Sequence, residues 1–301
     1  VEEVFLMASV MRRIKSSSVV QLTRLARGIA GLPASVSDAT RSGLQRMGVQ
    51  ALTPVQVETL AALDGHDGRR DLLAKARTGT GKTVAFLIPT VERLRSLPLG
   101  GRGAGAPVRS LIISSTRELA SQIAVEAAKM GRQLNVQLAV GGVKMPKMWR
   151  TLDARCGAID ILVATPGRLE ACIAESRDFC RRLEGLDTLV LDEVDQLLSA
   201  GFRPAIDRIV STLPRERQTL CFSATVPAEA KKVIAQTLRR DFLTVDCTAA
   251  GGERGGGDAD THANIQQEAL VVPMKDSLAA LAGSVLQEIA SAPTTHKIIV
   301  F

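Results

Sequence analysis

A glycine-rich loop is the first segment whose residue types and spacing indicate chemistry. Residues 76–83 read Ala-Arg-Thr-Gly-Thr-Gly-Lys-Thr and stand between a short apolar run and a helical pattern. Backbone N–H groups of such a loop, together with the N-terminus of the next helix, bind phosphate oxygens. Lysine then reaches the β and γ phosphates, and the last threonine offers a hydroxyl to Mg²⁺. The loop predicts a nucleotide site formed by Thr78, Gly79, Thr80, Gly81, Lys82 and Thr83, against the alternative of a glycine-rich turn with a solvated lysine.

An acidic cluster supplies the second candidate half of that site. The apolar run 189–191 ends in Asp192, Glu193, Val194 and Asp195. Carboxylates at the carboxyl end of a strand lie where open α/β sheets bind ligands. Asp192 suits coordination of Mg²⁺ through water, and Glu193 suits orientation and deprotonation of an attacking water. An acidic helix cap is the alternative interpretation of the cluster taken alone.

The elements that must position these groups follow from the hydrophobic pattern. Short β-branched apolar runs alternate with amphipathic stretches, which is typical of a parallel sheet flanked by helices, an α/β fold. We expect strands near residues 71–74, 110–114, 137–140, 159–164, 188–192, 219–223 and 243–247, then near 265–272 and 297–301, with a helix over 275–289.

Composition narrows the class of partner. The 301 residues carry a net charge of +7, which favours a polyanion. Aromatic residues make up 3% of the chain and tyrosine is absent, so a platform for stacking bases is not expected. No apolar run is long enough to span a bilayer. Five scattered cysteines and three distant histidines predict neither a disulfide framework nor a zinc site.

The ordered motifs resemble those of one family. Over residues 44–301 the chain is similar to the N-terminal RecA-like domain of the DEAD-box ATP-dependent RNA helicases, followed by the start of a second RecA-like domain. The resemblance implies a P-loop NTPase fold that binds ATP and Mg²⁺. Residues 53–56, Thr-Pro-Val-Gln, resemble the adenine-reading segment, and this assigns adenine recognition to Gln56. Residues 76–83 match the family's own phosphate-loop variant, in which alanine replaces the first glycine.

Further motifs of that family are implied to contact RNA or to couple the sites. Residues 115–120, 141–142 and 165–168 resemble its RNA-contacting motifs, with Ser115 in place of the usual proline. The motif at 223–225 resembles the one that links the nucleotide state to domain closure. Val194 replaces the family's alanine, and the aromatic residue expected upstream of Gln56 is absent from residues 28–33. The implied RNA contacts are Thr116, Arg117, Gly142, Thr165, Gly167 and Arg168, and the implied coupling residues are Asp195, Ser223 and Thr225.

The chain is expected to divide into four parts. Residues 1–36 form a basic extension that resembles an organelle transit peptide, with a basic solvated extension as the alternative. Residues 37–247 form the ATP-binding domain, 248–261 a glycine-rich linker, and 262–301 the start of a truncated second domain. The expected location is intracellular, in an organelle (mitochondrion or plastid) or in the nucleus or cytoplasm.

The expected function is that of an ATP-dependent RNA helicase, which unwinds short duplexes or remodels RNA–protein complexes. RNA is expected to bind through its backbone without strong sequence preference. We expect a monomer without membrane contact, whose second domain supplies arginine fingers not found within the 301 residues. One alternative is a truncated nucleotide and weak RNA-binding module with little or no turnover. Another is a DNA-directed or non-helicase phosphate-loop ATPase.

Overall fold

The computed structural model describes residues 28–29, 32–64, 69–97, 103, 105–153, 155, 157–248, 270–291, 298 and 300. It divides into two units, Val1–Gly252 and Glu253–Phe301. Most of the predicted N-terminal extension and linker therefore lies outside the described residues. Within the described part, no helix is long and apolar enough to cross a membrane.

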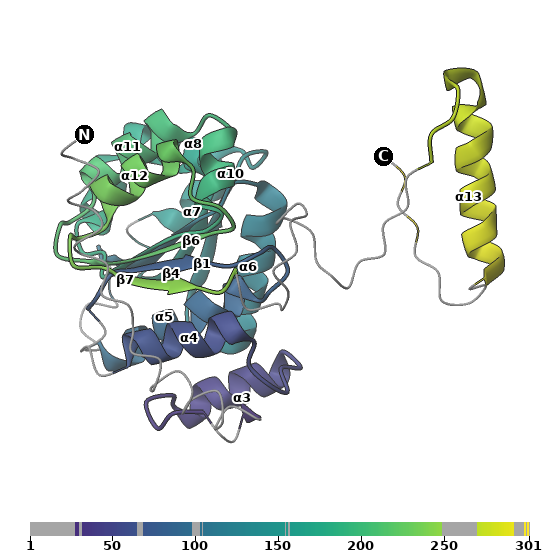
Figure 1. Ribbon diagram of the computed structural model, residues 1–301. Coiled ribbons are helices and arrows are strands. Elements are labelled where there is room, and N and C mark those ends of the chain that lie inside the picture. Colours follow the sequence, from purple (N-terminus) through teal and green to yellow (C-terminus); the bar gives the residue numbers. More distant parts are fainter. Residues whose placement is uncertain are drawn as a thin grey trace, which may run out of the picture. The chain divides into compact units, whose positions relative to one another are not determined.

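The first unit is an α/β domain whose elements alternate along the chain (Figure 1). Its helices are α3 (Asp38–Arg46), α4 (Pro54–Leu63), α5 (Lys82–Ser96), α6 (Arg117–Met130), α7 (Met145–Leu152), α8 (Pro166–Glu175), α9 (Arg177–Leu183), α10 (Val194–Ser199), α11 (Arg203–Thr212) and α12 (Ala228–Thr237). Its strands are β1 (Leu72–Lys75), β2 (Val108–Ile113), β3 (Val136–Ala139), β4 (Ile159–Ala164), β5 (Thr188–Leu191), β6 (Gln218–Ser223) and β7 (Leu243–Asp246).

All seven strands form one parallel sheet in the order β3-β4-β2-β5-β6-β1-β7. The predicted parallel sheet flanked by helices is thus confirmed, and each of the seven strands expected before residue 248 begins and ends within two residues of its prediction. The strand order is not a property of spacing along the sequence. It places the three strands that precede the predicted RNA motifs together on one side of β5, and β6 and β1 on the other side.

The second unit contains a short 3-10 helix, η3 (Met274–Asp276), and the helix α13 (Ser277–Ser291), drawn in yellow in Figure 1. The helix expected over 275–289 is confirmed. The flanking strand expectations were wrong where they can be checked, because residues 270–272, 298 and 300 belong to no strand. A strand needs a neighbour to satisfy its backbone N–H and C=O groups, and the described residues of this unit contain none. Residues 265–269 and most of 297–301 lie outside the described part.

Two apolar layers cover the two faces of the sheet. Successive strand residues alternate between the layers, so Leu72 and Ala74 of β1 face one layer while Leu73 faces the other. Helices α3, α4, α5 and α6 bury residues in the first layer, where Phe86 of α5 meets Phe222 of β6 edge-on with ring centroids 5.4 Å apart. Helices α7 to α12 bury residues in the second. Figure 1 shows the two groups on opposite sides of the sheet.

A buried arginine ties the loops at the amino end of β2 and β4 to α9. Arg182 is 2% exposed and donates hydrogen bonds to the backbone carbonyls of Ala106 (2.7 Å), Leu152 (2.7 Å), Asp153 (2.9 Å) and Gly157. A guanidinium group is the side chain with enough donors in a fixed plane to satisfy several carbonyls at once. One buried side chain therefore links the segments that precede β2 and β4 and the end of α7 to α9.

This arrangement predicts that replacing Arg182 destabilises the protein much more than replacing its neighbour Arg181. Arg182→Met leaves buried carbonyls without donors, which costs roughly 1 to 3 kcal/mol for each group, so we expect a loss of about 3 kcal/mol or more in the free energy of unfolding. Arg181→Met is the control, because that side chain is 73% exposed and forms a surface ion pair with Asp178. Urea unfolding of both variants measures the difference, and equal losses would refute the role of Arg182.

Candidate functional site

The phosphate loop leaves β1 and enters α5 in a conformation that only glycine adopts readily. Gly79 and Gly81 have φ of 73° and 89°, in the left-handed region that other residues avoid. Gly81 caps the N-terminus of α5, and the first backbone N–H groups of a helix have no partner within the helix. Lys82 is 6% exposed, and its Nζ donates to the carbonyl of Ala76 at 3.2 Å across the loop. In this conformation the carbonyl of Ala76 accepts the hydrogen bond that a ligand's phosphate oxygen would otherwise accept from Lys82.

Gln56 reaches the phosphate loop from α4. Its side chain is 3% exposed; Nε2 donates to the carbonyl of Gly81 at 3.0 Å, while Oε1 accepts from the backbone N–H of Thr53 at 3.0 Å. A Cβ atom at position 81 would lie 2.4 Å from Gln56 Nε2. The segment expected to read adenine is therefore in direct contact with the loop expected to hold phosphate, and glycine at 81 permits this contact.

Asp192 is a buried carboxylate with an unused oxygen. It follows β5, is 2% exposed, and Oδ1 has no hydrogen-bond partner among the described residues. Burial raises the pKa of Asp192 to about 7; the nearby Lys82 lowers it and Glu193 raises it. A buried acceptor that the protein leaves unpaired suits a cation. Asp192 at the end of β5 and Thr83 in the first turn of α5 therefore fit Mg²⁺, which prefers oxygen ligands.

Glu193 is held in a strained conformation at the start of α10. Its φ of 52° is the only positive value at a non-glycine residue in the described part of the chain. Such a conformation costs roughly 1 to 3 kcal/mol and persists at functional positions when the surroundings enforce it. Burial raises the pKa of Glu193, and Asp195 raises it further, whereas Lys82 and the hydroxyl of Ser115 lower it. Lys82 thus acts electrostatically on both Asp192 and Glu193, so the two predicted half-sites face each other.

Asp195 joins the acidic cluster to the motif after β6. Its Oδ2 accepts from the backbone N–H and the hydroxyl of Thr225 at 2.8 and 2.9 Å, and its own N–H donates to Ser223 Oγ at 3.1 Å. Ser223 also accepts, through its carbonyl, from the N–H of Ala76 at 3.0 Å. The residues predicted to couple the sites therefore form one hydrogen-bonded chain between the acidic cluster and the phosphate loop.

These contacts predict opposite stability effects for two aspartates of one motif. The pKa of Asp192 lies above its ordinary value of 3.8, so this group weakens the folded state as the pH rises from about 4 to 7. Without ligand at pH 8, Asp192→Asn is expected to add roughly 1 to 3 kcal/mol of stability, since one pKa unit corresponds to about 1.4 kcal/mol. The gain should shrink towards pH 5.

Asp195→Asn is the matched control. Burial raises the pKa of Asp195, but the bonds from Thr225 and Ser223 outweigh it and leave that pKa lowered. Its removal should therefore destabilise the protein. Thermal unfolding at pH 5 and pH 8 measures both variants, and a loss of stability in Asp192→Asn at pH 8 would contradict this account.

Most of the residues predicted to contact RNA line a cavity at the same edge of the sheet as the phosphate loop. A cavity of about 690 Å³, which we call the RNA-side cavity, lies between the N-termini of α6 and α8. Of the predicted RNA contacts, Thr116, Arg117, Thr165, Gly167 and Arg168 line it. Gly142 stands beside it: a Cβ atom there would lie 2.9 Å from Nη1 of Arg117, and its φ is 85°. Gly141, its neighbour, lines the cavity itself.

Several side chains around this cavity already have protein partners. Thr116 Oγ1 accepts from the N–H of Leu119 at 3.1 Å as the cap of α6, and Arg168 Nη1 contacts Met145 Sδ at 2.6 Å. Gly167 has no atom near the position of an added Cβ, so the first turn of α8 is open. The open backbone N–H groups at the starts of α6 and α8 can bind phosphate oxygens.

Two further residues, Ala171 and Phe202, line this cavity and were not predicted from the sequence. Phe202 follows α10, and its only signal in the sequence was an apolar aromatic residue after Gly201 in a chain with few aromatics. Ser115 also lines the cavity; its Oγ forms no complete hydrogen bond here, yet it lies close enough to Glu193 to lower the pKa of that carboxyl. Ser115 thus stands between the RNA-side cavity and Glu193.

The residues that depart from the family's pattern are buried in the two apolar layers. Val194 is fully buried in the second apolar layer, among the residues of α10 and its neighbours. Ile29 and Leu32, which occupy the segment where the family has an aromatic residue, are 9% and 6% exposed and pack in the first apolar layer. Neither side chain presents a broad open face to a base.

Comparison with known proteins agrees with this geometry. The sequence profile of the DEAD/DEAH box helicase family matches residues 53–233. DEAD-box ATP-dependent RNA helicase 25 of Oryza sativa subsp. japonica is 38% identical over 272 residues, which cover 89% of this chain and 44% of that protein. The protein of the same name in Arabidopsis thaliana is 38% identical over 271 residues, which cover 88% of this chain and 46% of that protein. The chain thus spans about half the length of the curated relatives it matches.

Solved structures show the same fold. The structure of Mss116p, with its NTE and C-tail deleted and bound to ssRNA and AMP-PNP, matches with a TM-score of 0.75 at 25% identity, covering 90% of this chain and 54% of that one. A DEAD box protein from Methanococcus jannaschii matches with a TM-score of 0.60 at 26% identity, and the match covers 83% of this chain and 61% of that one. The RecA-like fold implied by the resemblance is therefore confirmed. With a family profile that covers more than half of its residues, the chain belongs to the DEAD/DEAH box helicase family.

Proposed function

We propose that the complete protein is an ATP-dependent RNA helicase that locally separates short RNA duplexes or remodels RNA–protein complexes. The observation that carries the proposal is the meeting of Lys82 with Asp192 and Glu193 at the edge of the sheet that also holds the 690 Å³ cavity. A nucleotide triphosphate and an RNA backbone would then bind to one surface, on either side of the boundary between β2 and β5.

The nucleotide half would work as follows. Gln56 would exchange its bonds to Gly81 and Thr53 for the edge of adenine, and the glycine loop would surround the phosphates. Lys82 would move from the Ala76 carbonyl to the terminal phosphates. Glu193 would orient the attacking water and accept its proton. Asp192 and Thr83 would hold Mg²⁺, which neutralises charge on the phosphates as it develops.

The RNA half would hold backbone rather than bases. The N-termini of α6 and α8 would bind phosphates, with Arg117 and Arg168 adding charge. The hydrogen-bonded chain through Asp195, Ser223 and Thr225 would transmit changes at the phosphates to the interface with a second RecA-like domain. ATP and RNA would each favour the closed arrangement of the two domains and so favour each other's binding.

Two alternatives remain distinguishable by experiment. The curated relatives are named as ATP-dependent RNA helicases, which disfavours a binding module without turnover. ATPase activity should be measured on this chain and on a version extended into the second domain, with single-stranded RNA and single-stranded DNA. Strong stimulation of the extended version by RNA alone supports the proposal. Equal stimulation by DNA would favour a DNA-directed enzyme, and no stimulation would favour the module.

The RNA half makes a prediction of its own. Arg168→Gln should weaken RNA binding and reduce the slope of log affinity against log salt by about 0.7, the value for one phosphate of a single strand. Arg177→Gln is the control, because Arg177 is exposed at the start of α9 and does not line the cavity. Fluorescence anisotropy of labelled RNA over a salt series gives both slopes. An unchanged slope for Arg168→Gln would remove Arg168 from the RNA site.

A further inference from the structure

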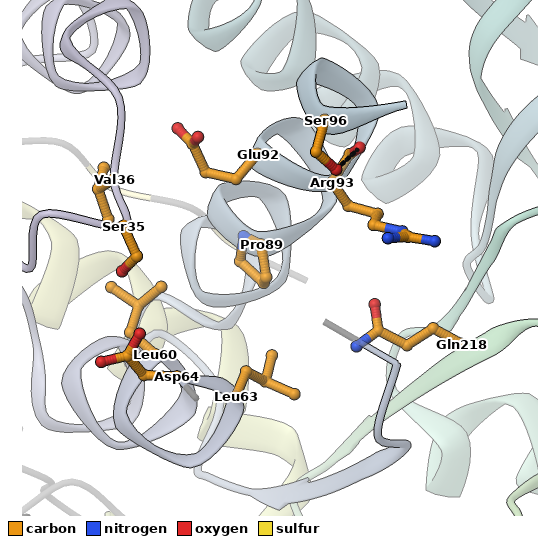
Figure 2. Close-up of a pocket in the computed structure, with 10 residues that line it drawn as sticks. All are labelled: Ser35, Val36, Leu60, Leu63, Asp64, Pro89, Glu92, Arg93, Ser96 and Gln218. Carbon is orange, nitrogen blue, oxygen red and sulfur yellow. Dashed lines mark hydrogen bonds between the residues drawn. The ribbon is translucent and has the colours of Figure 1, made fainter. Parts of the chain in front are cut away.

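Two adjoining cavities lie at the amino ends of the strands, at the opposite edge of the sheet from the phosphate loop. The larger has a volume of about 490 Å³ and lies between the second halves of α4 and α5. Figure 2 shows Leu60 and Leu63 of α4 on one side of it, with Arg93 and Gln218 close together on another. A volume of this size suits a small molecule.

The smaller cavity, about 60 Å³, shares Arg93 and Gln218 with the larger one. Four arginines line it against two acids, so we call it the arginine cavity; it is lined by Arg69, Arg93, Arg217 and Arg239 with Asp187, Glu216 and Gln218. One water needs roughly 10 to 15 Å³ of such space. The arginine cavity therefore has room for a few waters or for one oxyanion.

Arg217 is the unexplained group in this cavity. It is 8% exposed, yet no carboxylate of the described residues forms an ion pair with it, and its Nε has no hydrogen-bond partner there. Nη1 of Arg217 donates to the neutral carbonyl of Pro214. Burial lowers the pKa of Arg217, the negative charge of Asp71 offsets this in part, and the proximity of Arg239 lowers the pKa further. Asp71 is shared with Arg239, and Arg217 itself forms no ion pair among the described residues, so an anion bound here would offset the cost of burying this cation.

Two of the nearby acids are already engaged, and the third, Glu216, is exposed to solvent. Asp187 forms a two-pronged pair with Arg93, at 2.9 Å to Nε and 2.7 Å to Nη2. Asp71 accepts from the N–H of Thr219 at 2.8 Å and from Arg239 Nη2 at 3.0 Å. Arg239 nevertheless keeps a buried Nε without a partner. Two guanidinium Nε–H donors thus remain for a ligand at this edge.

We propose that the two cavities bind a small organic anion, with its carboxylate or phosphate group in the arginine cavity and its apolar body against Leu60, Leu63 and Pro89. Paired oxygens of such a group match the donors of a guanidinium. We infer an apolar body because the larger cavity adjoins the arginine cavity and offers apolar side chains. Arg93 and Gln218 line both cavities. The site is independent of the proposed helicase function, because it uses none of the residues assigned to ATP or RNA.

The test follows the Nε–H resonance of Arg217 in ¹H–¹⁵N NMR spectra of this chain, assigned by its disappearance in Arg217→Lys. The probes are acetate, hexanoate, hexyl phosphate and hexanol. Hexanoate or hexyl phosphate should shift this resonance and bind at least about tenfold more tightly than acetate, since each buried methylene adds up to roughly fourfold. Hexanol, which lacks the charge, should not shift it. The better of the two anions identifies the head group.

Variants separate the site from other anion sites. Arg69→Gln, at the exposed rim, should weaken binding of the preferred probe severalfold without loss of stability, and this keeps the test valid if Arg217→Lys does not fold. Arg215→Gln, on the exposed side of the same loop, and Lys82→Ala, at the phosphate loop, should leave the affinity unchanged.

Three results would overturn the proposal. The first is an Arg217 resonance that no anion shifts, and the second is equal affinity for acetate and hexanoate. The third is binding that occurs only in Asp67→Asn, which would identify Asp67, outside the described residues, as the counter-ion. Failure of ATPase activity in the extended protein would leave this site untouched, so the two proposals fail separately.

Discussion

Replacing Lys82 by alanine is expected to abolish RNA-stimulated ATP hydrolysis and to weaken nucleotide binding by roughly 10- to 100-fold. A hydrogen bond to a charged group contributes about 1.5 to 3 kcal/mol, and the ammonium group of Lys82 is positioned to give such bonds to the phosphates. It also offsets the repulsion between Asp192 and Glu193, whose pKa values it lowers. A fluorescent ATP analogue measures affinity, and phosphate release by the protein extended into its second domain measures turnover.

Lys75→Ala is the matched control for this prediction. Lys75 lies on β1, seven positions before Lys82, and its ammonium group pairs with Asp246 at 3.3 Å instead of facing the loop. The Lys75→Ala variant should bind nucleotide with an affinity within about twofold of that of the unchanged protein, since an exposed ion pair contributes little to stability. A Lys82→Ala variant that hydrolyses ATP as the unchanged protein does would show that the glycine loop is an ordinary turn.

The Glu193→Gln variant should bind ATP with unchanged affinity and hydrolyse it about 10² to 10⁴ times more slowly. Glutamine has the same shape and keeps the conformation at the start of α10, but its amide cannot accept a proton, and loss of a general base costs rates of this order. Single-turnover hydrolysis in the extended protein with RNA present separates the chemical step from binding.

Glu229→Gln controls for the change of charge. Glu229 is exposed in the first turn of α12, where it faces solvent, so its replacement should leave both binding and turnover unchanged. If Glu193→Gln hydrolysed ATP at the normal rate, another group would have to activate the water. Asp192 would then be the remaining carboxylate near Lys82, and its assignment to Mg²⁺ would also fail.

Much of the fold was predictable because it depends on local patterns. The run at 159–164 is buried at every position in β4, as expected for a strand covered on both faces. The phosphate loop was found because glycine is required at Gly79 and Gly81, where φ is positive. The motifs then fell at the carboxyl ends of the strands, where the hydrophobic pattern had placed them.

What could not be predicted depends on contacts between distant residues. Nothing near Arg182 in the sequence shows that four carbonyls of separate loops surround it. Phe202 lines the RNA-side cavity because it precedes α11, which packs against α8. The unpaired Oδ1 of Asp192 and the lone Nε of Arg217 are likewise properties of burial, which a sequence pattern indicates for apolar residues but not for charged ones.

The central claim is that the glycine loop and the acidic cluster bind one magnesium-nucleotide together. A crystal structure of this chain with Mg²⁺ and AMP-PNP tests it most directly. The account predicts density for one metal ion between the terminal phosphates, the hydroxyl of Thr83 and waters held by Asp192, with Lys82 turned from Ala76 to the phosphates. Nucleotide density that touches the loop but leaves Asp192 and Glu193 without contact to metal, water or phosphate would contradict it.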